Sequence, residues 1–356
     1  MEATIDFDFS LCVNFCILSI HQLGASDSIF DMDPKLVTPE LIQKWTCRTP
    51  PEPVNTLSDI DLSYHCPLDN GRHAFEPSQP AGGFSKLPVE LVANIFLQLD
   101  LLTITSFRQV NKQARLLVDA IPQYGLLYQA CPGILRAVIS VQARFFDLKK
   151  LYETVCCVTK CSECPAFGGY LYLITCERVC YCCFTSRENL RPAIEREAMG
   201  GNHRTRKSLM QFPNIRAVAG RYGPRALLQR DRRSIWHRPP IRLKVSRRPF
   251  SVFSPLNFQE GETRRYMAVV AAPYFDLPCK IPKLGLYCLG CELGVTSPPQ
   301  KQYTKQGYVE HLSFFGEVLV VKDKKAANGW KASHRQKRLV AWPAWTHDVE
   351  ATELQA

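Results

Sequence analysis

Residues 87–110 read LPVELVANIFLQLDLLTITSFRQV and carry apolar side chains at helical spacing. The apolar stripe predicted for a first helix, with the two residues that widen it, consists of Leu91, Val92, Ile95, Phe96 and Leu99. Pro is tolerated at the first position of a helix, so this helix is expected to begin beside Pro88. Thr103 can cap a second helix that places Ile104 and Phe107 on one face. A third helix follows, and because helices of about ten residues are marginal alone, the three need a neighbour.

The same residues resemble the F-box motif and align with it without a gap. The resemblance implies a three-helix domain that docks onto the Skp-type adaptor subunit of SCF ubiquitin ligases and through it joins a cullin. The residues expected to make that contact are Leu87, Pro88, Leu91, Ile95, Leu99, Ile104 and Val110. Two positions depart from the family pattern, because Leu101 stands where proline is frequent and Ala114 where an aromatic is usual. The alternative is an ordinary buried helical hairpin, since apolar stripes usually face a core.

The chain holds sixteen cysteines among its 356 residues, and their chemistry depends on the redox compartment. The apolar run from Phe9 to Ile20 follows acidic residues and lacks the basic flank of a secretory signal. It is also shorter than the roughly 20 apolar residues that span a membrane. We therefore expect a chain of the cytoplasm or nucleus with no membrane contact. Clustered cysteines in these reducing compartments bind metal more often than they form disulfides.

Eight of the cysteines fall between residues 156 and 183. They include two Cys-x-x-Cys pairs separated by fifteen residues, a spacing that lets both pairs point their sulfurs at one tetrahedral Zn²⁺. The predicted ligands of this structural zinc are Cys161, Cys164, Cys180 and Cys183. Cys176 or Cys182 could instead replace Cys180 or Cys183 as a ligand. The alternative to metal binding is that these cysteines are small buried hydrophobic residues.

Short strands and helices are expected around the cysteines. A turn and strand at 168–174 would bring the two pairs together, and a helix at 187–197 would complete a treble-clef-like module. The run RYMAVVAAP at 265–273 predicts a strand, and a short helix is expected at Pro39–Trp45. The predicted fold class is α+β, with an N-terminal three-helix F-box followed by helices and a small zinc-stapled module with short strands.

A third Cys-x-x-Cys pair, Cys288 and Cys291, has no fourth pair to match it. His311 is a candidate third ligand, although a lone histidine is more often structural. F-box proteins of filamentous fungi resemble the chain here, because they carry a second knuckle followed by a His-x-x-x-Cys element. This chain has Phe315 at the cysteine position. The resemblance, over roughly residues 85–315, indicates a second metal site and leaves its fourth ligand open.

The net charge of +11 is distributed unevenly along the sequence. Residues 1–86 have a net charge of −7, whereas residues 187–248 hold seventeen basic and four acidic side chains. Prolines interrupt the basic stretch and its arginines follow no helical period, which favours a solvated loop over a surface that tracks phosphates. Lys324-Lys325 and Arg335–Arg338 resemble a bipartite nuclear signal with a short spacer. A zinc-containing nucleic-acid-binding protein is the alternative function.

The sequence thus predicts a non-catalytic adaptor that carries an unidentified protein substrate to a ubiquitin ligase. It contains no Gly-rich phosphate loop and no Gly-x-Ser-x-Gly elbow that would indicate an enzyme. Nucleic acid is not an expected partner. The expected organisation is a mostly disordered acidic, Pro-rich segment at 1–84, the F-box at 85–120, a helical linker at 121–155, the Cys-rich zinc module at 156–200, a basic flexible region at 201–255, a strand and knuckle region at 256–320 and a basic polar tail at 321–356.

Overall fold

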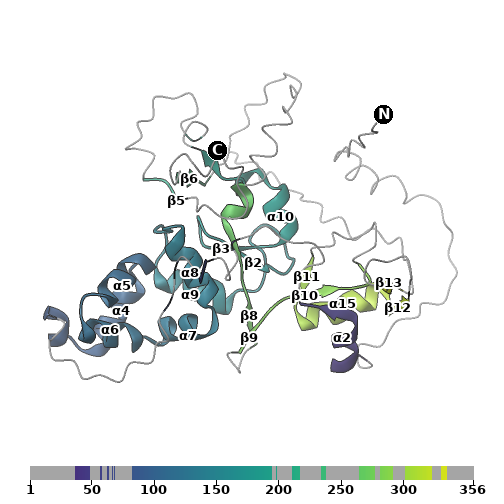
Figure 1. Cartoon of the computed structure of the whole chain (residues 1–356), viewed down its shortest axis with the longest axis horizontal. Helices are drawn as coiled ribbons and strands as arrows, with labels where there is room; N and C mark the ends of the chain where they lie inside the picture. Colours follow the sequence, from purple (N-terminus) through teal and green to yellow (C-terminus); the bar gives the residue numbers. More distant parts are fainter. Residues whose placement is uncertain are drawn as a thin grey trace, which may run out of the picture.

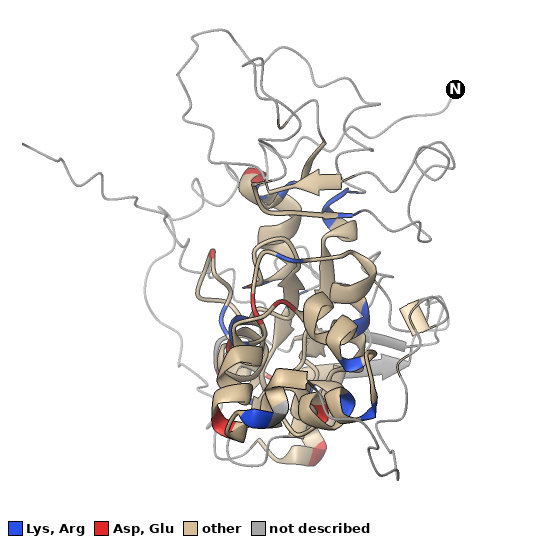
Figure 2. Cartoon of the chain, turned by 90° about the vertical axis from the view of Figure 1, so that its left-hand side faces the viewer, with Lys and Arg blue, Asp and Glu red and all other residues tan. Residues whose placement is uncertain are grey.

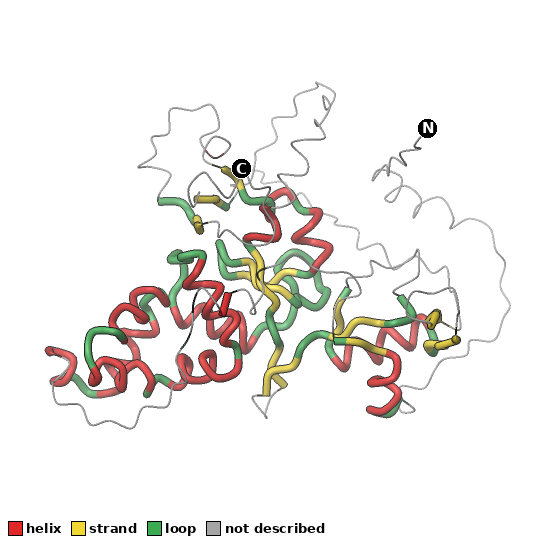
Figure 3. The backbone as a smooth tube through the Cα atoms, in the orientation of Figure 1, coloured by secondary structure: helices red, strands yellow, loops and turns green. Residues whose placement is uncertain are grey.

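The structure, a computed structural model, describes residues 37–48, 57, 62–63, 66, 68, 82–194, 198, 211–216, 234–237, 264–276, 281–291, 301–322 and 330–334. Helices gather on one side, short strands occupy the middle, and a small unit of helices and strands lies on the other side (Figure 1 and Figure 3). This mixture confirms the predicted α+β class. Within the described residues, every helix is too short or too polar to cross a membrane.

A run of helices begins after a 3-10 turn, η2 (Gly82–Lys86), and continues to residue 152. The helices are α4 (Val89–Leu97), α5 (Leu101–Arg108), α6 (Lys112–Asp119), α7 (Pro122–Ala130), α8 (Pro132–Ser140) and α9 (Leu148–Tyr152). Asp100 caps α5, because its carboxylate accepts hydrogen bonds from the N–H groups of Leu102 and Thr103, both at 3.0 Å. The prediction that Thr103 caps this helix was wrong, since the carboxylate one turn earlier suits the positive end of the helix dipole.

Aromatic rings and one ion pair hold the first three helices together. Phe96 of α4 packs against Phe84 and Phe107, with ring centroids 5.7 and 5.0 Å away. Arg108 of α5 and Asp119 of α6 form a bidentate salt bridge with N–O distances of 2.7 and 3.0 Å. Paired contacts of this kind fix geometry as well as adding energy, so α5 and α6 are held as one hairpin.

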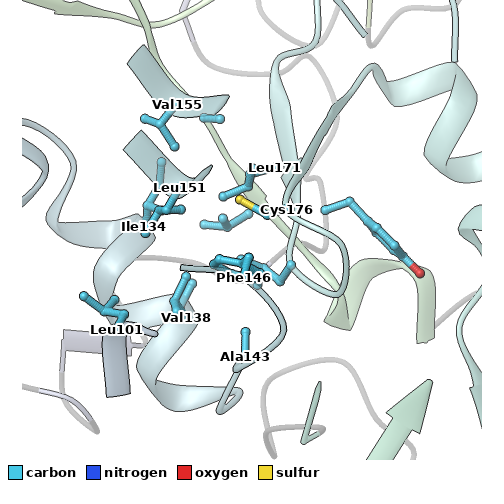
Figure 4. Close-up of a cluster of buried hydrophobic side chains, with 14 of the residues drawn as sticks. Leu101, Ile134, Val138, Ala143, Phe146, Leu151, Val155, Leu171 and Cys176 are labelled. Carbon is cyan, nitrogen blue, oxygen red and sulfur yellow. The ribbon is translucent and has the colours of Figure 1, made fainter. Parts of the chain in front are cut away.

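The main core continues from the helices into the strands. Figure 4 shows Leu101 of α5, Val138 of α8 and Leu151 of α9 in one buried cluster with Leu171 and Cys176, which come from the strand region. A π-helical turn, η3 (Glu153–Cys157), leads from α9 into that region. The helical half and the strand half therefore share a single core.

An antiparallel sheet with strand order β3-β2-β7 forms the centre of the molecule. Its strands are β2 (Tyr170–Tyr172), β3 (Glu177–Val179) and β7 (Val269–Ala271). The strand predicted at 265–273 is thus shorter than expected, because residues 264–267 are helical. The helical turn lets the Arg265 guanidinium donate to the carbonyl oxygens of Phe184 and Arg187, at 3.0 and 2.6 Å.

Two smaller sheets flank the centre. One has the order β4-β6-β5, from β4 (Ala193–Ile194), β6 (Ser234–Trp236) and β5 (Asn214–Arg216). The other is the hairpin of β8 (Tyr274–Asp276) and β9 (Ile281–Lys283). Strands β5 and β6 lie inside the stretch predicted to be basic and flexible, most of which falls outside the described residues.

The second unit is built from the two ends of the described chain. Its elements are α2 (Pro39–Trp45), β1 (Thr46–Cys47), β10 (Leu286–Cys288), β11 (Gln302–Tyr303), α15 (Lys305–Phe315), β12 (Val318–Lys322) and β13 (Trp330–His334). Strand β10 lies between β1 and β11, and β12 pairs with β13. The predicted helix at Pro39–Trp45 is confirmed, and it packs here with Ile42 and Trp45 buried.

Candidate functional site

Helix α4 presents two neighbouring apolar faces, about 100° apart around the helix axis, that differ in burial. Val92 and Phe96 are 2% and 0% exposed and face the core. Leu91 and Ile95, one residue earlier in each turn, are 50% and 39% exposed. The sequence predicted a single stripe widened by Val92 and Phe96; the structure instead separates a core face from an uncovered face. The reason is that residues four apart share a face of a helix, so each i, i+4 pair has a face of its own.

The uncovered apolar residues of the F-box-like region lie close in sequence to the start of α4 and the end of α5. They are Leu87, Val89, Leu91, Ile95 and Val110, whose exposed fractions run from 39% to 68%. Pro88, the N-cap of α4, is also exposed. Two other predicted contact residues lie deeper, because Leu99 packs partly buried against the core and Ile104 is fully buried. Val89 was missed by the sequence analysis, although it neighbours Leu87 and Pro88.

The predicted first metal site is formed by a Cys-x-x-Cys turn, a β-hairpin and the first turn of a helix. Cys161 and Cys164 follow η3, strands β2 and β3 form the hairpin, and Cys180 caps helix α10 (Tyr181–Ser186), which carries Cys183. The sulfurs of all four cysteines lie within 4.8 Å of one another, and the Sγ atoms of Cys164 and Cys180 are 3.6 Å apart. This group could hold a metal ion.

Backbone N–H groups point at the sulfurs of this group. The N–H groups of Glu163 and Cys180 donate to Cys161 Sγ at 3.4 and 3.3 Å. The N–H of Cys183 donates to Cys180 Sγ at 3.4 Å. Hydrogen bonds with Cys161 lower the pKa of Cys164 to about 7 and raise the pKa of Cys183, so the shared protons favour thiolate at some of the four sulfurs. Donors that favour the thiolate are what a metal ligand requires, because thiolate sulfur is the form that binds metal.

Neither alternative ligand belongs to the group. Cys176 points into the main core instead (Figure 4). Burial raises the pKa of its thiol to about 12, which keeps the sulfur protonated. Cys182 precedes Cys183 on α10 but is not among the four converging sulfurs.

The described part of the segment 187–197, residues 187–194, does not form the expected helix. The chain there forms a 3-10 turn, η4 (Glu188–Leu190), and then β4, and the helix lies earlier as α10. Arg187 has an extended backbone with φ −75° and ψ 131°, which ends α10 before the expected start. The treble-clef-like order of knuckle, hairpin and helix is kept, with the helix beginning at the second cysteine pair.

A second group of possible metal ligands forms in the other unit. Cys288 and Cys291 come from the end of β10 and the turn after it, His311 from α15 and His334 from β13. His334 Nε2 lies 3.3 Å from Cys288 Sγ and 3.4 Å from Cys291 Sγ, and His311 Nε2 lies 3.4 Å from Cys291 Sγ. Four donor atoms therefore converge on one point, and the group could hold a metal ion.

His334 is the member of this group that the sequence did not predict. It lies in what was predicted to be a basic polar tail, and the spacing from Cys291 follows no knuckle pattern. The family pattern has its cysteine at position 315, but Phe315 is an aromatic neighbour of the group, with its ring centroid 4.7 Å from that of His311. The available signal was the apolar run at 318–321, which predicts a strand and therefore a partner strand nearby.

Both histidine rings turn Nε2 toward the sulfurs, and their pKa values shift in opposite directions. His334 Nδ1 lies 3.0 Å from the carbonyl oxygen of Gly316, a contact that orients the ring and turns Nε2 toward the sulfurs. Burial lowers the pKa of His311, which favours neutral imidazole, the form that binds metal. Burial lowers the pKa of His334 too, but its hydrogen bond with Cys288, the charge of that cysteine and the Gly316 carbonyl together outweigh burial and raise that pKa. The orientation of both rings, and the protonation state of His311, therefore match ligands that bind through Nε2.

A family model for the F-box domain matches residues 84–124. Comparison with curated proteins and with solved structures gave no match. The matched interval covers the end of η2, the three helices α4 to α6 and the first residues of α7. The exposed apolar residues Leu87, Leu91, Ile95 and Val110 lie within it. Residues 84–124 of this chain are therefore an F-box domain.

Proposed function

We propose that this protein is the substrate-recognition subunit of an SCF-type ubiquitin ligase. Its F-box binds a Skp-type adaptor, which joins it to a cullin, and its C-terminal half binds a protein substrate. F-box proteins in general are non-catalytic substrate adaptors. The observation that carries the proposal is the uncovered face of α4, where Leu91 and Ile95 are 50% and 39% exposed.

Exposed leucine and isoleucine side chains are unfavourable in free energy unless a partner buries them. Fully burying a leucine or isoleucine side chain contributes about 1.5–3 kcal/mol. Leu91 and Ile95 are half-exposed in the chain alone, so part of that energy remains for a partner. Val92 and Phe96 of the same helix are buried in the main core. The core therefore holds α4 in place before the partner arrives, which limits the ordering cost of binding.

We propose that both Cys/His groups bind zinc. Tetrahedral zinc with Zn–S bonds of about 2.3 Å and Zn–N bonds of about 2.05 Å places S–S edges near 3.8 Å, S–N edges near 3.6 Å and N–N edges near 3.3 Å. The corresponding distances are 3.6 Å between Cys164 and Cys180, 3.3–3.4 Å between sulfur and nitrogen in the second group, and 3.2 Å between the two histidines. Four protein ligands fill each site, so both zinc ions are structural.

The test is a pair of substitutions on the uncovered face with a matched control outside the F-box. Leu91→Asp combined with Ile95→Asp should abolish co-purification with the Skp-type adaptor, because each change places a charge in an apolar interface. Phe145→Asp is the control, since Phe145 is 39% exposed like Ile95 but lies outside residues 84–124. The control should bind as wild type does. If the double variant recovers as much adaptor as wild type does, the exposed face of α4 is not the adaptor-binding surface.

The nucleic-acid alternative has less support. In Figure 2, which looks onto the helical side, basic and acidic residues are interspersed among uncharged ones. The most basic stretch of the sequence falls largely outside the described residues. The competing function expects binding of random-sequence RNA with affinity that falls steeply as salt rises. A location in the cytoplasm or nucleus goes with the adaptor proposal, and imaging of the tagged protein tests it.

A further inference from the structure

The second unit is completed by a segment that arrives from far away in the sequence. Strand β1 adds to the edge of β10 in antiparallel register, with Thr46 opposite Cys288 and Cys47 opposite Tyr287. The carbonyl oxygen of Trp45 accepts two hydrogen bonds, from Leu289 N–H and from the Tyr308 hydroxyl, both at 3.1 Å. Most of this attachment is made by the backbone of the segment.

Only two side chains of the segment are anchored deeply. Ile42 and Trp45, three residues apart on α2, are each 6% exposed and join the cluster around Tyr308 and Leu312. The other α2 residues point outward or are partly covered, and Glu40, Gln43 and Lys44 are exposed among them. A helical turn with two apolar anchors, followed by an added strand, combines two known modes of peptide recognition.

The surface that receives the segment contains a candidate metal site that can hold it together. The four candidate ligands Cys288, Cys291, His311 and His334 join β10, α15 and β13, and all lie within 288–334. Strand β11 pairs with β10 on the side away from β1. The metal and these elements can therefore keep the surface formed without α2 and β1. In contrast, the seven-residue helix α2 is too short to be stable by itself in water.

We propose that the edge of β10 and the adjoining face of α15 form a peptide-docking site, which residues 38–47 occupy in cis and which a substrate segment of the same chemistry occupies in trans. That chemistry is an aliphatic residue, an aromatic residue three positions later, and an extended backbone after it. The inference rests on the proposed function, since it names how the C-terminal half selects a substrate. The cis segment then acts as an intramolecular competitor.

The experiment uses the full chain and a fluorescent peptide with the sequence of residues 36–48. A full-chain variant combines Ile42→Asp with Trp45→Asp. Both changes place a charge where an apolar anchor was buried, so residues 38–47 should leave the site. The peptide should bind this variant about tenfold more tightly than wild type, because a tethered competitor acts at up to about millimolar effective concentration. Unlabelled peptide should compete, and a peptide carrying the same two substitutions should not.

Tyr308→Phe, added to the chain variant, should weaken binding several-fold by removing one hydrogen bond to the peptide backbone.

Two results would overturn the docking site. One is a double variant that keeps two zinc ions per chain but does not bind the peptide. The other is a double variant that loses zinc from the second group, which would make residues 38–47 an obligatory part of the core. Adaptor binding is measured on the same samples and should be unchanged, since the F-box face lies in another part of the fold. Failure of the wild-type chain to bind the adaptor would count against the ligase proposal, whereas failure of the double variant alone to bind the peptide would count against the docking site.

Discussion

The Nε2 atoms of His311 and His334 lie 3.2 Å apart, although the two histidines come from a helix and from a strand of a separate hairpin. Two neutral imidazoles can share at most one proton between these atoms. Cys291 Sγ lies within 3.4 Å of both nitrogens, so a single hydrogen bond cannot satisfy the group. A metal ion at the common centre satisfies all four donors at once.

The zinc content of the chain should follow from this geometry. Wild-type protein purified without chelator should carry about two zinc ions, one for each tetrahedral group. His334→Ala should carry about one, and Cys161→Ser, in the other group, should also carry about one. Ser333→Ala, next to His334 on β13, is the matched control and should keep both. Plasma mass spectrometry gives the ratio, and two zinc ions in His334→Ala would exclude that histidine as a ligand.

The two faces of α4 should separate stability from binding. Phe96→Ala should lower the free energy of unfolding by about 3–5 kcal/mol, because it removes a buried ring from the core. Leu91→Ala should change it by about 0.5 kcal/mol, as is usual for exposed positions. Urea unfolding followed by circular dichroism measures both. A large loss of stability in Leu91→Ala would mean that this residue belongs to the core after all.

Local patterns predicted the parts of the protein whose residues are close in sequence. The F-box helices, the helix at Pro39–Trp45 and the convergence of Cys161 with Cys180 all follow from periodicity or short spacing. The pairing of β1 with β10 and of β2 with β7 did not follow, because short strands joined across the chain leave no periodic signal. His334 was missed for the same reason, since a ligand brought in by a hairpin has no fixed spacing.

Arg178 should be a strong determinant of stability although its hydrogen-bond partners among the described residues are all backbone carbonyls. Its side chain is 1% exposed and donates to the backbone carbonyls of Thr154, Val155 and Gly168 at 2.9, 2.8 and 2.7 Å. It also donates to the carbonyl of Pro273, so it joins η3 to the segment after β7. Desolvation lowers its pKa to about 10, which leaves it charged at neutral pH.

Both Arg178→Met and Arg178→Lys should therefore destabilise the protein by several kcal/mol. Methionine leaves these buried carbonyls unsatisfied, at about 1–3 kcal/mol each. Lysine has the charge but cannot reach acceptors on both sides with a single nitrogen. Arg216→Met, at an exposed position, is the control and should stay within about 0.5 kcal/mol of wild type. Urea unfolding of the three variants decides the matter, and a lysine variant as stable as wild type would show that charge alone matters at this position.

The reactivity of individual cysteines should reveal which thiols are structural and which are held by metal. Burial raises the pKa of Cys131 and of Cys156 to about 12, as it does for Cys176. At pH 8 a thiol with a pKa near 12 has about a thousandfold less thiolate than one with a pKa near 9, and thiolate is the reactive form. These three cysteines should therefore resist alkylation in the folded protein. Cys157, which is exposed and adjacent to Cys156, is the internal control and should react at once.

The cysteines of the first metal group should change their behaviour when a chelator is added. While zinc is bound, Cys161, Cys164, Cys180 and Cys183 should react slowly with iodoacetamide, because each sulfur is coordinated. After a strong chelator removes the metal, these four should be alkylated ahead of Cys176, which stays in the main core as long as the fold survives. Mass spectrometry of peptides from protein quenched at successive times measures each rate. Alkylation of Cys161 at the rate of Cys157 before chelation would contradict metal binding at this group, and early alkylation of Cys176 would contradict its place in the core.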